Sequence, residues 1–435
     1  MGKKVALHNL GCKVNAYELE AVEQLLEEKG YEIVPFAPGA DVYIINTCTV
    51  TNIADRKSRQ MLHRAKKMNP DAVVVAAGCY VQAGAEKLQK DPAIDIVVGN
   101  NRKKEIPDIL ESYLAEGRRR REVSDIAHEK EYELLNIVRT EEHIRAFLKI
   151  QDGCNQFCSY CIIPYTRGRV RSRAPEDVVR EVERLAASGC REIVLSGIHL
   201  SSYGVDLKDK YGLLELVQRL HPVEGISRIR LGSLEPGIIT EEFADSLSRL
   251  PKVCPHFHLS LQSGCDRTLE RMNRRYTSGE YLEKCTILRK YFENPALTTD
   301  IITGFPGETE EDFLESRNFI EKVSFFETHV FPYSRREGTK AAKMEDQIPE
   351  AVKKERSRVL LELNRVQKEN YLAGAVGRET EVLLEEKENF EGRTAWTGYT
   401  REYRKVLVLS DKNLANTLLR VRPEMVCGGE FLLCT

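Results

Sequence analysis

The chain has 435 residues, of which 42% are hydrophobic and 30% charged, and its formal net charge is −2. This length exceeds one ordinary core and predicts two or three domains, while the composition excludes a disordered chain. No apolar run approaches the roughly 18 residues that cross a bilayer, so we expect a cytoplasmic protein with no membrane partner.

Residues 1–117 alternate between strand and helix patterns. Helices are expected at 17–29 and 52–68, where apolar residues recur at helical spacing and Gly30 and Pro70 follow the helical runs. Alternation of this kind predicts an open, mostly parallel α/β domain. The expected strands are 4–9, 41–47, 72–77 and 94–99.

A charge-rich interval, 118–139, suits a linker, and a second alternating region follows at 140–370. Its six strand patterns, with helical patterns between them, predict a partial (β/α)6 barrel, shorter than the eight-unit form. Pro349 then opens a long amphipathic helix that ends near residue 372. The expected barrel strands are 146–151, 192–196, 228–231, 257–261, 297–302 and 325–331.

The last part of the chain, 371–435, contains short β-rich segments separated by glycine-rich turns. This pattern predicts a small β-barrel domain. The expected segments are 380–384, 403–409, 417–421 and 430–434.

Three cysteines, Cys154, Cys158 and Cys161, follow the first barrel strand at the spacing C-x3-C-x2-C. In a reducing compartment such cysteines indicate metal or redox chemistry rather than disulfides. Three thiolates can hold a [4Fe-4S] cluster and leave one iron open, whereas a closed zinc site needs a fourth ligand at zinc-finger spacing. The position at the C-terminal end of a barrel strand favours the open cluster.

A second trio, Cys12, Cys48 and Cys79, is spread along the first domain, with each cysteine near the C-terminal end of a predicted strand. Ligands of open α/β sheets bind beyond those ends, so the trio could converge on one site. The alternative is three unrelated buried residues. The remaining cysteines lack metal-binding spacing and are expected to be structural: Cys190, Cys254, Cys265, Cys285, Cys427 and Cys434.

Polar and glycine residues follow other barrel strands, namely Ser233 with Glu235, then Gln262, and then 304–307. We expect them at the same mouth of the barrel, where small residues let the backbone approach a nucleotide. Any one of these segments could instead serve only to turn the chain.

With these residues in view, the chain resembles a methylthiotransferase of the radical S-adenosylmethionine superfamily over essentially its whole length. The resemblance rests on Leu10-Gly-Cys-Lys-Val-Asn15, Asn46-Thr-Cys-Thr-Val-Thr51 and Gly78-Cys-Tyr-Val-Gln82, in that order. The C-x3-C-x2-C loop continuing to Gly168, the segment 304–308 and a C-terminal module similar to TRAM RNA-binding domains complete the set.

The motifs around Cys12 and Cys48, with Ser196-Gly-Ile-His-Leu-Ser-Ser-Tyr203, are most similar to one branch of that family. That branch converts N6-threonylcarbamoyladenosine at tRNA position 37 to its 2-methylthio derivative, with S-adenosyl-L-methionine as radical source and methyl donor. Two alternatives stay open. One is a methylthiotransferase acting on isopentenyladenosine tRNA or on a ribosomal protein, and the other is a non-catalytic iron–sulfur RNA-binding sensor.

The resemblance also implies cofactors, partners and contacts. Each cysteine trio would hold one [4Fe-4S] cluster, and the partners would be a tRNA anticodon stem-loop, a flavodoxin- or ferredoxin-type electron donor and a sulfur donor. The implied cofactor contacts are Tyr160, Ser233, Glu235, Gln262, Gly304, Phe305 and Gly307. Stacking and phosphate contacts by aromatic and cationic residues suit RNA, and the expected RNA contacts are Arg167, Trp396, Tyr399, Arg401 and Arg404.

Overall fold

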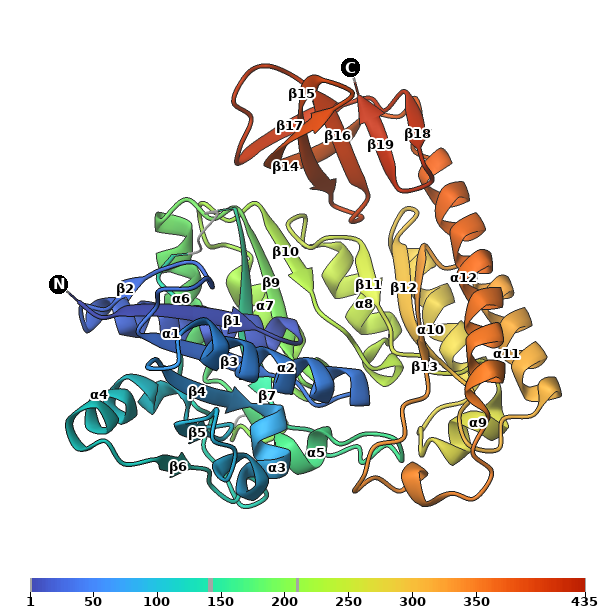
Figure 1. Cartoon of the computed structure of the whole chain (residues 1–435). Helices are drawn as coiled ribbons and strands as arrows, with labels where there is room; N and C mark the ends of the chain where they lie inside the picture. Colours follow the sequence, from blue (N-terminus) through green and yellow to red (C-terminus); the bar gives the residue numbers. More distant parts are fainter. Residues whose placement is uncertain (1, 140–143, 209–210, 435) are drawn as a thin grey trace.

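The computed structural model describes residues 2–139, 144–208 and 211–434, which form three units in chain order (Figure 1). The blue-to-cyan first unit lies beside the green-to-yellow central unit, and the long helix α12 (Glu350–Ala373) leads from the central unit to the red third unit. None of the helices in the described ranges has the length and apolar content that a bilayer span requires.

The first unit is a six-stranded parallel sheet in the order β2-β1-β3-β4-β5-β6. Tyr43 and Ile45 pack on one face of this sheet, whereas Val42 and Ile44 pack on the other. The predicted open parallel α/β domain is confirmed. Its strands are β1 (Lys4–Asn9), β2 (Glu32–Ile33), β3 (Val42–Thr47), β4 (Val73–Gly78), β5 (Ile96–Val98) and β6 (Arg120–Glu122). Its helices are α1 (Lys13–Glu28), α2 (Asn52–Met68), α3 (Cys79–Gln89), η1 (Lys103–Glu105) and α4 (Ile106–Glu116).

The interval expected to be a linker is partly built into the fold. Its first residues form β6, which extends the first sheet beside β5. Further along, Leu135 and Ile137 are buried in the core of the central unit, and the Tyr132 hydroxyl donates to the carbonyl oxygen of Lys149. These three residues lie among many charges, which is why the local pattern resembled a solvated linker.

The central unit contains the six predicted parallel barrel strands in two hydrogen-bonded groups. One group has the order β10-β9-β7-β8 and the other β11-β12-β13, and isolated bridges from Ile229 to Val253 and from Leu234 to Leu259 link them. The partial barrel is confirmed. The strands are β7 (Arg145–Asp152), β8 (Arg171–Ser172), β9 (Glu192–Gly197), β10 (Arg228–Leu231), β11 (His256–His258), β12 (Ala296–Thr303) and β13 (Glu327–Pro332).

Helices cover the outside of this barrel and bury an apolar core that includes Leu148, Leu195 and Phe257. The α-helices are α5 (Ile163–Thr166), α6 (Pro175–Ala187), α7 (Leu213–Leu220), α8 (Glu241–Ser248), α9 (Asp266–Arg271), α10 (Ser278–Tyr291) and α11 (Glu310–Val323). Short 3-10 turns are η2 (Leu200–Ser202), η3 (Pro236–Ile238) and η4 (Ala341–Lys343).

The third unit is a six-stranded, largely antiparallel sheet in the order β17-β14-β15-β16-β19-β18, consistent with the predicted small β-barrel. Strand β15 was not predicted, because Gly398 interrupts its alternation. A Cβ at Gly398 would lie 2.1 Å from the carbonyl oxygen of Leu383, so the strand pairing excludes a side chain there. The strands are β14 (Thr380–Phe390), β15 (Arg393–Thr400), β16 (Lys405–Leu409), β17 (Thr417–Val421), β18 (Met425–Cys427) and β19 (Phe431–Cys434).

Candidate active site

A cavity of about 620 Å³ lies at the mouth of the barrel, where the first unit meets the C-terminal ends of the barrel strands. Cysteines from both predicted trios border it: Cys12 from the first unit, and Cys154, Cys158 and Cys161 from the central unit. The cavity therefore brings one cysteine of the first-unit trio together with the three cysteines of the barrel loop.

The loop that carries Cys154, Cys158 and Cys161 is shaped by its backbone. Gly153 precedes it with φ +72°, and a Cβ there would lie 1.8 Å from the carbonyl oxygen of Arg169, so only glycine fits. The Cys161 amide donates to the carbonyl oxygen of Cys158 at 2.9 Å, which closes the loop tightly. All three cysteines of this loop line the cavity.

Burial, with a smaller contribution from the neighbouring Cys158, raises the pKa of the Cys154 thiol to about 11 and that of Cys161 to about 12. In the metal-free chain these thiols are protonated at neutral pH. Iron binding must therefore displace protons, as it does wherever thiolates are the ligands.

The cysteines of the second trio follow three strands of the first sheet at the same edge of that sheet. Cys12 begins α1 after β1, Cys48 follows β3 and Cys79 begins α3 after β4, and these three strands are neighbours in the sheet. A Cβ built on Gly11 would lie 3.1 Å from the Cβ of Cys48. Burial raises the pKa of Cys48 to about 11, and the thiols of Cys79 and Cys12 contribute in the same direction.

The donor sets fit iron–sulfur clusters better than single ions. In the described ranges, the groups of three or more ligand atoms within 4.8 Å of one another are His258–Asp300–His329 and Cys265–Asp312–Glu315, and neither cysteine trio is among them. Zinc–sulfur bonds of about 2.3 Å would hold sulfurs on one ion closer together than that limit. Three widely spaced thiols suit a cluster with one open iron.

Each trio also has an arginine that donates to one of its sulfurs. Arg274 Nη1 lies 3.2 Å from Cys158 Sγ, and Arg167 Nε lies 3.3 Å from Cys79 Sγ. Hydrogen bonds to sulfur and nearby positive charge are among the factors that set cluster potentials. The arginines are therefore suited to anionic, thiolate-ligated clusters.

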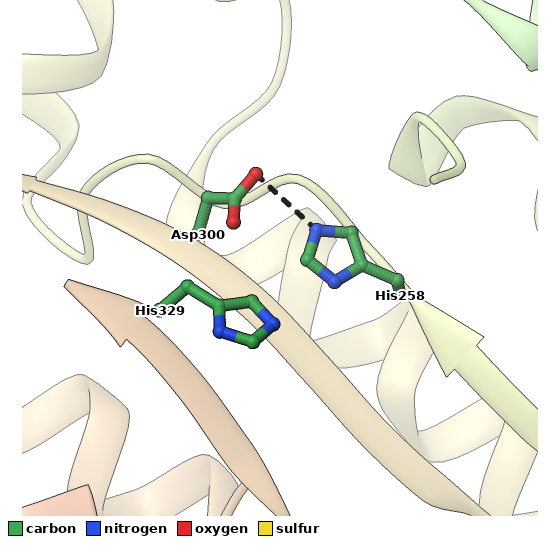
Figure 2. Close-up of side chains that lie close together, drawn as sticks. All are labelled: His258, Asp300 and His329. Carbon is green, nitrogen blue, oxygen red and sulfur yellow. Dashed lines mark ion pairs between the residues drawn. The ribbon is translucent and has the colours of Figure 1, made fainter. Parts of the chain in front are cut away.

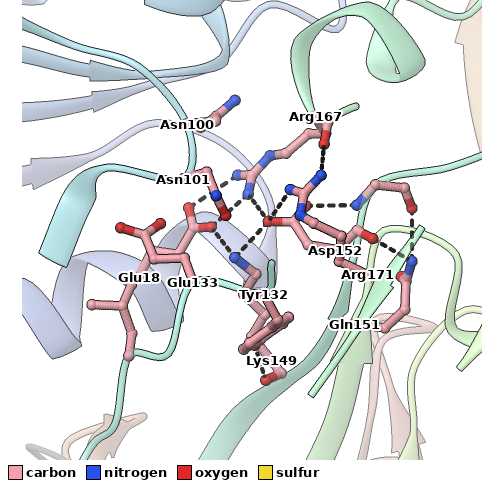
Figure 3. Close-up of polar contacts among 12 residues, drawn as sticks. Glu18, Asn100, Asn101, Tyr132, Glu133, Lys149, Gln151, Asp152, Arg167 and Arg171 are labelled. Carbon is pink, nitrogen blue, oxygen red and sulfur yellow. Dashed lines mark hydrogen bonds and ion pairs between the residues drawn. The ribbon is translucent and has the colours of Figure 1, made fainter. Parts of the chain in front are cut away.

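Arg167 belongs to a buried ion-pair network that joins the first and central units (Figure 3). Its guanidinium contacts Glu18 Oε2 at 3.0 Å and Asp152 Oδ2 at 3.2 Å, while Lys149 and Lys103 each approach Glu18 at 2.7 Å. Because its side chain is 0% exposed, the RNA contact expected for Arg167 is wrong. The arginine lies between the trios instead.

The implied cofactor contacts divide into two groups. Tyr160, Ser233, Glu235 and Gln262 line the cavity with the cysteines. The three residues of the other group lie outside that lining in the described chain: Gly304, Phe305 and Gly307.

The 304–307 segment is held by contacts of its own. The Glu308 carboxylate accepts from the amides of Gly304 and Phe305 at 2.6 and 3.0 Å. A Cβ on Gly307 would lie 1.3 Å from the Arg271 guanidinium, so the glycine permits this arginine to close over the turn.

Among the lining residues outside the expected contacts, four have charged or imidazole side chains: Lys13, His199, Arg274 and Asp300. Arg274 donates to both carboxylate oxygens of Glu235 at 2.8 Å, and His199 Nε2 lies 3.6 Å from Glu235. The Ser-Gly-Ile-His segment at the end of β9 was a signal for His199. No local signal linked Arg274 to a glutamate 39 residues earlier.

The expected RNA contacts of the third unit lie largely at its interface with the barrel. Arg401 Nη2 donates to the carbonyl oxygens of Pro251 and Val253 at 2.6 and 2.7 Å, and the Arg404 guanidinium lies 4.4 Å from the centre of the Tyr371 ring. Trp396 and Arg404 are each only 6% exposed. For these two residues the structure corrects the expectation, because buried side chains cannot bind RNA.

Tyr399 also serves this interface. Its ring stacks on Tyr403 at 4.7 Å, the Arg145 guanidinium lies 4.9 Å from the ring centre, and Arg228 donates to its carbonyl oxygen at 2.8 Å. The aromatic and cationic cluster that suggested an RNA surface therefore fastens the third unit to the N-terminal ends of barrel strands.

Two family models match the chain: the radical SAM superfamily over residues 148–320, and a family described as "Uncharacterized protein family UPF0004" over residues 4–99. Threonylcarbamoyladenosine tRNA methylthiotransferase MtaB of Bacillus subtilis is 43% identical over 420 residues, which cover 96% of this chain and 93% of that protein. The tRNA-2-methylthio-N(6)-dimethylallyladenosine synthase of Moorella thermoacetica is 39% identical over 420 residues, which cover 95% and 94%.

Among solved structures, the radical S-adenosylmethionine methyltransferase TsrM of Kitasatospora setae, with cobalamin and a [4Fe-4S] cluster bound, shares the fold. The match has a TM-score of 0.56 at 18% identity and covers 76% of this chain and 75% of that chain. Sequence similarity of this extent to two methylthiotransferases, together with the two cysteine trios, establishes the relationship. The chain belongs to the radical S-adenosylmethionine methylthiotransferase family, whose enzymes use S-adenosyl-L-methionine and [4Fe-4S] clusters.

Proposed function

We propose that this enzyme converts N6-threonylcarbamoyladenosine at position 37 of tRNA to its 2-methylthio derivative. The observation that carries the proposal is that Cys12 of the first-unit trio and all three cysteines of the barrel loop line one cavity, in a chain 43% identical to a protein named for this substrate. The Moorella relative, at 39% identity, is named for dimethylallyladenosine in tRNA, which supports isopentenyladenosine tRNA as the second candidate substrate.

In this proposal Cys154, Cys158 and Cys161 hold the cluster that binds S-adenosyl-L-methionine, and the first-unit trio holds the auxiliary cluster. When bound, the clusters and S-adenosyl-L-methionine supply the radical, the sulfur and the methyl group. The protein binds and orients these groups and excludes water.

The lining residues support a division of labour. Tyr160, Ser233 and Gln262 border the space beside the cysteine loop. They would contact S-adenosyl-L-methionine through its nucleoside portion or its methionine portion. Arg274 holds Glu235 in place through two hydrogen bonds. Gln151 accepts from the His199 amide at 2.7 Å and so fixes the loop after β9 at the cavity edge.

The partners follow from the same chemistry. We propose a tRNA anticodon stem-loop as substrate, an electron donor of flavodoxin or ferredoxin type and a separate sulfur donor, all in the cytoplasm. Phosphate contacts need exposed cations. The exposed basic side chains of the third unit are Arg378, Lys387, Arg393, Lys412, Arg420 and Arg422.

Nucleoside mass spectrometry of tRNA tests the proposal. In cells lacking the gene, threonylcarbamoyladenosine should replace its 2-methylthio derivative, and the purified enzyme with reductant and S-adenosyl-L-methionine should restore the derivative. Methylthiolation of isopentenyladenosine tRNA instead would establish the second candidate. If no RNA gained mass while a ribosomal protein did, the RNA substrate would be wrong.

A further inference from the structure

Strands β11, β12 and β13 carry a row of polar side chains on one face. Their parallel register sets His258 beside Thr298 and Asp300 beside His329. Figure 2 shows the rings of His258 and His329 next to the Asp300 carboxylate. Residues two apart on a strand face the same way, so this face is polar along three neighbouring strands.

These side chains border a second cavity of about 380 Å³. Lys13, Ser233 and Asp300 line both this cavity and the larger one that holds the cysteines, so the two adjoin. At its other end the smaller cavity reaches Tyr403 of the third unit. Leu231 is the one aliphatic side chain in its described lining.

Several donors around the smaller cavity lack partners among the described residues. His256 Nδ1 is buried without a hydrogen bond, and His258 Nε2 lies 3.3 Å from Asp300 Oδ2 but is not aligned to bond it. The Lys13 ammonium, placed 5.5 Å from the Phe147 ring centre, forms no ion pair with a described carboxylate. Buried polar groups of folded proteins are normally satisfied, so the two buried histidine nitrogens left open at this cavity indicate a ligand, and the exposed Lys13 adds a cation beside them.

The charges favour an anionic ligand with hydrogen-bonding groups. Of the two carboxylates in the lining, Glu327 is paired with Lys368 at 3.3 Å and Asp300 faces His258. The Lys13 ammonium, the His329 ring and His258 Nε2, which forms no hydrogen bond, then remain as open groups at this cavity. His256 acts as a neutral ring, because burial and then Arg230 lower its pKa well below the usual value.

We propose that this histidine-lined cavity is the subsite for the N6 substituent of the substrate nucleoside, and that His258 and His329 bind its carboxylate. The proposal rests on the function proposed above. The carbon that gains the methylthio group and the carbon whose amino nitrogen bears the substituent belong to the same six-membered ring of adenine, so a base held beside the cysteines extends its substituent into an adjoining space. An apolar isopentenyl group would leave the donors of this cavity unpaired, which strongly disfavours binding.

The test compares two anticodon stem-loops that differ in one group, the natural threonyl carboxylate or a primary carboxamide of the same shape. A hydrogen bond to a charged group is worth enough to favour the carboxylate in kcat/KM by about ten- to hundred-fold in the natural enzyme. In the variants His258→Gln and His329→Gln the ratio of kcat/KM for the carboxylate stem-loop to kcat/KM for the carboxamide stem-loop should approach one. The control His63→Gln, on an exposed residue of α2 paired with Asp91, should keep the full ratio.

The outcomes separate the two proposals. If the natural enzyme fails to methylthiolate either stem-loop, the proposed function is wrong. If it reacts and both histidine variants keep its full ratio, the subsite is wrong while the function stands. Since the ratio compares two substrates on one protein, partial misfolding of a variant cannot mimic its loss.

A zinc-binding measurement tests the remaining alternative, in which these residues are metal ligands. The ligand atoms of His258, Asp300 and His329 lie within 4.8 Å of one another, so they could hold an ion. Enzyme loaded with both clusters is incubated with zinc, desalted and analysed for zinc per chain. No retained zinc agrees with the proposal, whereas one zinc that is lost in both histidine variants would make these residues metal ligands and overturn it.

Discussion

At the scale of single residues, the most informative side chain is Arg167. It is fully buried, donates to the Cys79 sulfur and pairs with Glu18 and Asp152, so it links the auxiliary trio to the barrel. Burial alone would raise the pKa of Glu18, but Arg167, Lys103 and Lys149 hold it well below the usual range. Each of the two buried carboxylates, Glu18 and Asp152, thus contacts more than one buried cation.

Replacing Arg167 with methionine should therefore destabilise the fold strongly. Removal of one partner from a buried ion-pair network leaves an uncompensated charge and costs about 3–5 kcal/mol. Denaturant unfolding of the purified chain measures the loss. The matched control is Arg180→Met, whose exposed pairing with Asp177 on α6 should contribute under about 1 kcal/mol. Equal losses in the two variants would contradict the assigned role of the network.

The cysteines could be predicted from the sequence because their chemistry is local, either in spacing or in position at strand ends. Arg167, Trp396 and Arg404 could not be placed, because arginine and tryptophan serve equally well at an RNA surface and in a buried interface. Only tertiary packing decides between those uses. The donors to sulfur were out of reach for the same reason, since Arg167 and Cys79 are 88 residues apart.

At the scale of elements, the third unit is held by a short apolar core and by contacts to the barrel. Trp396 on β15 packs with Val382, Leu384 and Val406, and Leu372 at the end of α12 joins the same cluster. The helix therefore both leads to the third unit and contributes to its core.

Trp396→Ala should unfold this unit rather than weaken RNA binding directly. Loss of a buried tryptophan side chain costs about 3–5 kcal/mol. Thermal unfolding should show an early transition, while the exposed residue opposite Trp396 in the register, Lys387, can be changed to alanine without it. An unshifted transition together with weaker tRNA binding would restore the RNA-contact interpretation of Trp396.

Most elements could be predicted because their patterns are strong. Strand β10 and helix α2 have the expected bounds, and β1 does as well. Strand β15 was missed at Gly398, where close backbone approach excludes a side chain. The polar row on β11 to β13 was also missed, because its residues acquire meaning only when three distant strands lie side by side.

At the scale of the whole molecule, buried charges fasten all three units together. On the side of the central unit that faces the third unit, Glu192 is 0% exposed and contacts Arg230 at 2.8 Å and Arg145 at 3.1 Å. These two arginines reach the third unit, because Arg145 pairs with Glu385 and Arg230 donates to the carbonyl oxygen of Arg401 at 2.9 Å. Arg228 extends the interface by donating to Glu381 of β14 at 3.0 Å. The interfaces combine ion pairs with apolar packing, so we expect the units to move as one body at neutral pH.

Acid should weaken the interface between the central and third units. Burial alone would raise the pKa of Glu192, but Arg230 and Arg145 outweigh it and lower the pKa from 4.5 to about 2. A carboxyl group whose pKa is lower in the folded than in the unfolded chain stabilises the fold at pH values above the unfolded pKa. For Glu192 this contribution to the free energy of unfolding is about 3 kcal/mol, and it is lost as the pH falls from 4.5 through 2. The unfolding free energies of the iron-free natural chain and of Glu192→Gln should therefore converge over that range.

The control for this comparison is Glu176→Gln, which removes an exposed pairing with Arg219. Its difference from the natural chain should stay small at every pH. A constant gap between the natural chain and Glu192→Gln down to pH 2 would show that Glu192 is not ionised in the folded protein.

The two trios should also be separable in the intact molecule. Reconstituted protein should bind about eight irons, and the triple variant in which Cys12, Cys48 and Cys79 become alanine about four. Because the barrel cysteines remain, that variant should still form 5′-deoxyadenosine from S-adenosyl-L-methionine with reductant, but no methylthio product. Iron analysis and nucleoside mass spectrometry measure both, and methylthio product from the triple variant would contradict the assigned roles.

The contact between Arg167 and Cys79 has a consequence for biosynthesis. The ribosome releases the first three thiols well before the arginine, which follows Cys79 by 88 residues. A nascent chain thus carries Cys12, Cys48 and Cys79 in an unfinished pocket until the loop after β7 has emerged. During that interval Cys79 lacks the hydrogen bond from Arg167, so the mature surroundings of the first-unit cysteines can form only after residue 167 has been synthesised.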